Sequence, residues 1–188
     1  MVLYRAYDSP SGRYWTPDFM AALQYTDNGH LGGERLFQLI PTVTMGVWRP
    51  SKQEVAEILG VALRCDDSYY HIYDLWEESP EAFKKLQAYC LEHQINWIVY
   101  EDDYPFAMKT CLWMGQEDTP PGEIVEVTPD DVVLTVFDPR DRKTYKGTFS
   151  ELIEPLEIEL TPGQPVTWQT ILEFFRDLRI EITDWDFK

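Results

Sequence analysis

The segment Asp131-Val-Val-Leu-Thr-Val-Phe137, continued by Asp138-Pro-Arg-Asp141 and Lys143-Thr-Tyr-Lys-Gly-Thr-Phe149, decides the fold of this chain. Its first part is rich in β-branched residues, which favour strands. The polar residues 138–141 are typical of a turn, so the chain is expected to return as a partner strand. A further strand is predicted at Glu123–Val127, joined to this hairpin at Pro129.

Helix signals surround these strands. Residues 167–178 keep apolar side chains at helical spacing and form the clearest amphipathic helix. Thr16-Pro17-Asp18 predicts a helix that runs to about Tyr25, with Thr16 as its cap. Ser51 to Glu54 has the pattern of a capping box, and Ser79-Pro80-Glu81 starts another helix.

Short strands complete the predicted architecture. They are expected at residues 2–7, 34–45, 95–100, 156–160 and 180–182. Residues 101–122 are expected to be mostly loop. Strands followed by helices predict an α+β protein with compact mixed or antiparallel sheets and three to four flanking helices.

The length of 188 residues suits one main domain. A soft boundary is predicted near residue 138. It separates residues 1–137 from a C-terminal hairpin, helix and strand at 138–188, which are expected to pack on the same domain.

Composition excludes several classes of protein. The apolar runs are a few residues long and no leader pattern opens the chain, so we expect a cytoplasmic protein without a membrane segment. The three cysteines are too few and too scattered for a disulfide framework, and Cys90 and Cys111 are expected to be buried thiols. The histidines and cysteines lack metal-ligand spacing, so no metal site is predicted.

The charge is unevenly distributed. Residues 1–50 hold four basic and four acidic side chains, so the whole net charge of −17 falls in residues 51–188. Such a charge repels phosphate backbones and argues against nonspecific nucleic-acid binding. It favours association with basic protein partners.

Several short motifs occur in a definite order. The first are Tyr4-Arg5-Ala6, then Gly12-Arg13-Tyr14-Trp15-Thr16, then a helix with Ala21, Ala22 and Tyr25; Asn96-Trp97-Ile98-Val99 and Glu123-Ile-Val-Glu-Val-Thr-Pro-Asp-Asp-Val132 follow much later. This order resembles the ADP-ribosyltransferase superfamily, in its phage and bacterial form, over roughly residues 3–48 and 95–133. Gly12-Arg13-Tyr14 is also similar to the opening of RES-type NAD hydrolases.

The resemblance implies an ADP-ribosyltransferase-like fold in which NAD is the substrate and ADP-ribose passes to a macromolecular target. It assigns the catalytic roles to Glu123 and Arg5. The residues that it implies in NAD binding are Arg5, Arg13, Tyr14, Trp15, Thr16 and Tyr25. A carboxylate such as Glu123 would stabilise the positive charge that develops on the ribose, and an arginine would bind the pyrophosphate.

Each of these residues also has a purely structural interpretation. Arg5 is equally suited to an ion pair at a sheet edge, Thr16 to a helix cap, Tyr25 to the core, and Glu123 to the exposed start of a strand. The competing hypothesis for the whole chain is a non-catalytic acidic interaction protein. Such a protein would mimic nucleic acid, inhibit a defence system or cover a basic toxin as an immunity protein.

Overall fold

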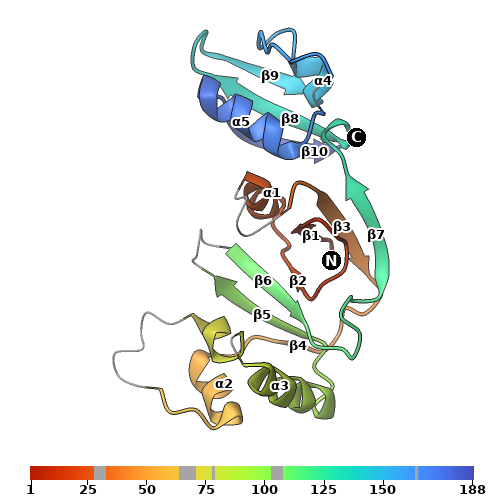
Figure 1. The fold of residues 1–188 in the computed structure, drawn as a ribbon, viewed down its shortest axis with the longest axis vertical. Helices are drawn as coiled ribbons and strands as arrows, with labels where there is room; N and C mark the ends of the chain where they lie inside the picture. Colours follow the sequence, from red (N-terminus) through yellow and green to blue (C-terminus); the bar gives the residue numbers. More distant parts are fainter. Residues whose placement is uncertain (28–32, 64–70, 78, 103–107, 164) are drawn as a thin grey trace. The chain divides into compact units, whose positions relative to one another are not determined.

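The computed structural model describes residues 1–27, 33–63, 71–77, 79–102, 108–163 and 165–188 and has an α+β fold (Figure 1). Contacts divide the chain into two compact units. The first contains Met1–Arg5, Pro10–Ala21 and Leu39–Ile124; the second contains Ala6–Ser9, Ala22–Gln38 and Val125–Lys188. Residues 125–137, which the sequence grouped with the N-terminal part, therefore belong to the same unit as residues 138–188.

The described elements follow the chain in this order. The helices are α1 (Phe19–Asp27), α2 (Lys52–Leu59), α3 (Pro80–Glu92), α4 (Phe149–Leu152) and α5 (Trp168–Leu178), with short 3-10 turns η2 (Ile72–Leu75) and η3 (Pro129–Asp131). The strands are β1 (Leu3–Ala6), β2 (Tyr14–Trp15), β3 (Leu36–Pro41), β4 (Val47–Trp48), β5 (Trp97–Asp102), β6 (Met108–Trp113), β7 (Gly122–Val127), β8 (Val132–Asp138), β9 (Lys143–Gly147) and β10 (Glu181–Phe187).

A mixed four-stranded sheet organises the first unit. Its strand order is β2-β6-β5-β4; β4 runs parallel to β5, and the other neighbours are antiparallel. Helices α2 and α3 contact each other and cover one face of this sheet (Figure 1). Both begin as the sequence predicts, with a capping box at Ser51 and Glu54 and a side-chain cap at Ser79.

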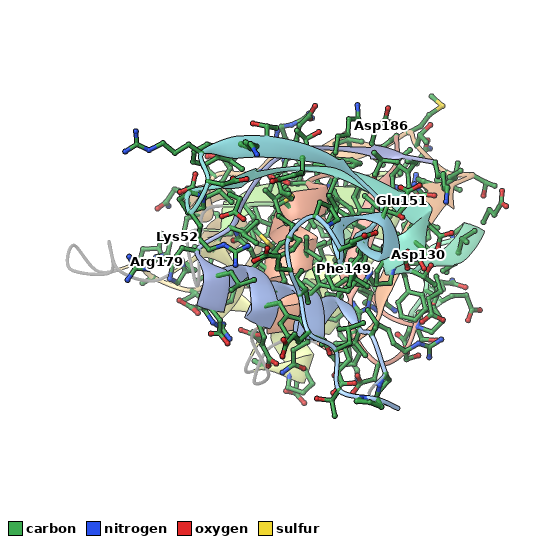
Figure 2. The ribbon with its side chains drawn as sticks, turned by 90° about the horizontal axis from the view of Figure 1, so that it is seen from above. Lys52, Asp130, Phe149, Glu151, Arg179 and Asp186 are labelled. Carbon is green, nitrogen blue, oxygen red and sulfur yellow. The ribbon has the colours of Figure 1, made fainter. Side chains whose placement is uncertain are left out.

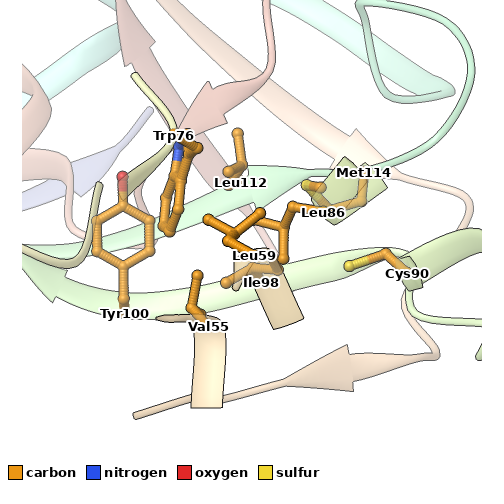
Figure 3. Packing of buried hydrophobic residues seen from close by; sticks show 9 residues of the cluster. All are labelled: Val55, Leu59, Trp76, Leu86, Cys90, Ile98, Tyr100, Leu112 and Met114. Atoms are coloured by element: carbon orange, nitrogen blue, oxygen red, sulfur yellow. The ribbon is translucent and has the colours of Figure 1, made fainter. Parts of the chain in front are cut away.

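The core of the first unit lies between these helices and the sheet (Figure 3). Leu59 and Leu86 come from the helices, while Ile98 and Leu112 come from β5 and β6. Cys90 belongs to the same cluster, which confirms that it is a buried thiol. Burial raises its pKa to about 12, so the thiol stays protonated and unreactive at neutral pH.

A second sheet, with strand order β1-β3-β7, has residues in both units. The third sheet, β10-β8-β9, is antiparallel and lies wholly in the second unit. This confirms the hairpin predicted at residues 131–149. The predicted amphipathic helix is α5, which begins at the cap Thr167 and buries Ile171 and Phe175.

The sequence was wrong in two places. Residues 101–122 contain β6, which lies between β2 and β5. Because β6 is buried on both faces from Thr110 to Trp113, its sequence lacks the alternation that marks a half-exposed strand. Residues 156–160 form no strand. Leu156 and Ile158 are buried around a left-handed turn at Glu157, and this turn imitates a two-residue period.

None of the helices in the described ranges has the length and apolar character that crossing a membrane requires.

A nearly buried ion pair closes the β8–β9 hairpin. The Asp138 side chain is 4% exposed and accepts hydrogen bonds from the Arg140 backbone N–H at 2.9 Å and from its guanidinium at 2.6–3.1 Å. The guanidinium also donates to the Leu156 carbonyl at 2.8 Å. These bonds hold the pKa of the Asp138 carboxyl below its ordinary value of 3.8.

We expect Asp138→Asn to lower the free energy of unfolding by about 2 kcal/mol at pH 7, because hydrogen bonds to a charged group are lost. A depressed carboxyl pKa stabilises the fold above the unfolded value of 3.8, and this contribution disappears as the pH falls through the folded value. Urea unfolding at several pH values should therefore show the two proteins converging below about pH 4. A constant difference down to pH 2 would contradict an electrostatic role.

Candidate functional site

Arg5 on β1 packs against the loop that precedes β2. Its guanidinium donates to the Tyr14 carbonyl at 2.9 Å. Gly12 lies directly beneath it, because a Cβ built on Gly12 would be 2.4 Å from the Arg5 Cζ. The predicted motif Gly12-Arg13-Tyr14 thus contacts the predicted catalytic arginine, and the glycine provides the space that this contact requires.

Arg13 is occupied by the protein itself. Its guanidinium donates to the carbonyls of Trp113, Gly115 and Gln116 at 2.7–3.2 Å and to the Asp118 carboxylate at 2.8 and 3.1 Å. It also lies 5.5 Å from the centre of the Phe83 ring, and its side chain is 13% exposed. These contacts use the donors that an anionic ligand would need.

Tyr14 and Trp15 point in opposite directions from β2. Trp15 is buried and donates from its indole to the Gly12 carbonyl at 2.9 Å, so its ring belongs to the core. Tyr14 is partly exposed, and its hydroxyl accepts from the Trp76 indole at 3.3 Å. Burial raises the pKa of the Tyr14 phenol, which therefore stays neutral.

Thr16 lies beside Arg5 but does not cap the first helix. Its backbone pairs with that of Tyr4 at 2.7 and 2.9 Å, and its hydroxyl accepts from the Asp18 N–H at 3.1 Å. The cap is Asp18, whose carboxylate accepts from the Ala21 N–H at 3.1 Å. Helix α1 therefore begins at Phe19, after Pro17, which corrects the predicted start.

The remaining predicted residues lie elsewhere. Glu123 is exposed on β7, and β3 separates that strand from β1, which carries Arg5. Tyr25 is half-buried on α1 and belongs to the second unit. Arg5, Tyr14 and Thr16 are thus brought together, whereas the assignment of Glu123 as a catalytic residue stays a prediction.

A different surface stands out in the second unit. The buried positions of β8 are Val132, Leu134 and Val136, and the alternate positions Val133, Thr135 and Phe137 are half-buried. Cross-strand pairing places residues of β10 beside that second set: Glu181 pairs with Phe137, Asp184 with Thr135, and Asp186 with Val133. We call these six residues the acidic face.

The three carboxylates form a row on the side of the sheet away from the helices. Figure 2 shows Asp186 across the sheet from Phe149, whose ring lies 6.2 Å from that of Phe175 on α5. Glu181, Asp184 and Asp186 are all exposed. Among the described residues, none of the three carboxylates forms an ion pair.

A bulge in β10 creates this row. The register shifts between Ile182 and Asp184, and the extra residue Thr183 donates from its hydroxyl to the Thr135 carbonyl at 3.1 Å. In a regular strand, residues 181 and 184 would point to opposite faces. The sequence analysis missed the row because the spacing from 181 to 184 is odd, and only the acidic composition signalled it.

No protein-family model, no curated protein and no solved structure matches this chain.

Proposed function

We propose that this chain is a non-catalytic interaction protein whose acidic face binds a basic protein partner. One observation carries the proposal: three exposed carboxylates without ion pairs in the described structure stand in register beside a half-buried apolar stripe. Apolar side chains flanked by charges of one sign are typical of a protein interface that selects a partner of opposite charge.

Electrostatics of the whole unit support this proposal. Residues 125–188 hold 14 acidic and seven basic side chains. Several of the acidic groups are already used within the unit: Asp138 pairs with Arg140, and Asp141 pairs with Lys143. The row on β10 retains its charge for an external cation. The same field repels nucleic acid, which leaves a basic protein as the partner.

The hydrogen bonding of Arg13 weighs against NAD binding as the first choice. An arginine that already donates to three carbonyls and a carboxylate would have to leave them to bind a pyrophosphate. NAD cleavage on an ADP-ribosyltransferase-like fold stays a second proposal, based on the contacts among Arg5, Tyr14 and Thr16. Release of nicotinamide by the wild type but not by Glu123→Gln would establish it.

The interaction proposal is tested with fluorescein-labelled deca-lysine as a minimal cationic probe. We expect the variant E181Q/D184N/D186N to bind it about tenfold more weakly than the wild type at low salt, because each exposed ion pair contributes about 0.2–1 kcal/mol. Fluorescence anisotropy at several salt concentrations measures the loss, and added salt should reduce the difference between the two proteins.

The matched control is E154Q/E159Q/D177N, which changes the net charge equally at three exposed positions of the same unit. It should bind nearly as well as the wild type. If both triple variants lose the same affinity, binding depends on net charge alone and the acidic face is not a site. Circular dichroism of all three proteins verifies that they remain folded.

A further inference from the structure

We infer that the acidic face recognises an extended segment with basic residues at every second position, lying along β10. The inference rests on the proposed function and adds the conformation and sequence pattern of the partner. It follows from the register of the carboxylates on the sheet rather than from their number.

The register gives the row a two-residue period. The β8 partners of the three carboxylates are Phe137, Thr135 and Val133, which are spaced two residues apart along an unbroken strand. Because strands rise about 3.4 Å per residue, neighbouring carboxylates stand about 6.8 Å apart. The bulge at Thr183 absorbs the one residue that would otherwise break this period.

An extended ligand repeats with the same period. Lysine or arginine at positions i, i+2 and i+4 of a strand would face Glu181, Asp184 and Asp186 in turn, as cross-strand pairs do within a sheet. A helix repeats differently: residues four apart rise about 6.0 Å and rotate about 40° further around the axis with each repeat. Its third basic side chain would therefore turn away from the third carboxylate.

The neighbouring rows restrict the ligand further. Val133 and Phe137 form a half-buried apolar stripe beside the carboxylates, and Lys146 on β9 pairs with Thr135 from the other side. The Lys146 ammonium repels a cationic segment placed over β9. The segment is thus directed to the β10 side of the sheet, where its basic residues meet the carboxylates.

Two labelled ten-residue peptides test the pattern. Both contain five lysines and five threonines, alternating in one and in two blocks in the other, so charge and composition are equal. We expect the wild type to bind the alternating peptide about fivefold to tenfold more tightly, because only this peptide presents a lysine to each carboxylate in an extended conformation. The variant E181Q/D184N/D186N should bind both peptides equally weakly.

Single variants provide an independent readout. Glu181→Gln, Asp184→Asn and Asp186→Asn should each reduce the preference for the alternating peptide, since each carboxylate faces its own lysine. Equal affinity of the wild type for both peptides, with weaker binding by the triple variant, would overturn the extended pattern and leave the proposed function standing. If the triple variant and its charge-matched control E154Q/E159Q/D177N bind both peptides alike, the proposed function itself fails.

Discussion

Replacing Arg13 by alanine is expected to lower the free energy of unfolding by about 3 kcal/mol, which is a large part of the stability of a typical domain. The guanidinium joins β2 to the loop that follows β6 through the carbonyls of Trp113, Gly115 and Gln116. Its bond to Asp118 adds little, because that carboxylate is 86% exposed. The loss therefore comes from the part-buried carbonyls and from packing on Phe83.

Urea unfolding monitored by tryptophan fluorescence measures this loss, which should appear as a midpoint shift of about 1 M. Arg13→Lys should be intermediate, because an ammonium keeps the charge but lacks the planar fork. Arg49→Ala, at an exposed position of the same unit, is the control and should change stability little. If Arg13→Ala instead retained full stability and lost only affinity for NAD, Arg13 would be a ligand-binding residue and the interaction proposal would lose its main contrast.

Local chemistry made much of the fold predictable. The helix starts at Ser51 and Ser79 were correct because their caps are side-chain hydrogen bonds between residues three apart, which a sequence displays directly. Helix ends were harder to predict. Helix α5 closes with Arg179 in a left-handed conformation, where its N–H donates to Arg176 and the N–H of Ile180 donates to Phe175. This hydrogen-bond pattern usually carries glycine, so an arginine there gives no signal.

Tertiary context decided what the sequence could not show. Strand β6 is recognisable only once β2 and β5 are known to flank it, because a strand buried on both faces has no alternating pattern. The candidate sites divide in the same way. The contact between Arg5 and Gly12 lies within a short segment that the sequence had marked. The acidic row instead depends on a bulge, which a sequence read with a strict two-residue period does not reveal.

Gly46 offers the second large effect, because it combines a left-handed conformation with a close backbone contact. Its φ is +67°, and a Cβ built there would be 2.2 Å from the Gln94 carbonyl oxygen. Its own carbonyl accepts from the N–H groups of Asn96 and Trp97 at 2.7 and 3.0 Å, which attaches β4 to the start of β5. Any shift that relieves the clash would therefore disturb the edge of the sheet.

We expect Gly46→Ala to lower the free energy of unfolding by about 3 kcal/mol: about 1 kcal/mol for the left-handed backbone and about 2 kcal/mol for the clash. Gly60→Ala is a matched control, because Gly60 has a φ of +73° and the nearest atom to its added Cβ is the Lys85 Nζ at 3.7 Å. This variant should lose only the conformational part. Urea unfolding of both variants separates the two contributions, and equal losses would show that the Gln94 carbonyl yields without cost. A clear difference would establish that the approach of β4 to β5 requires a residue without a side chain.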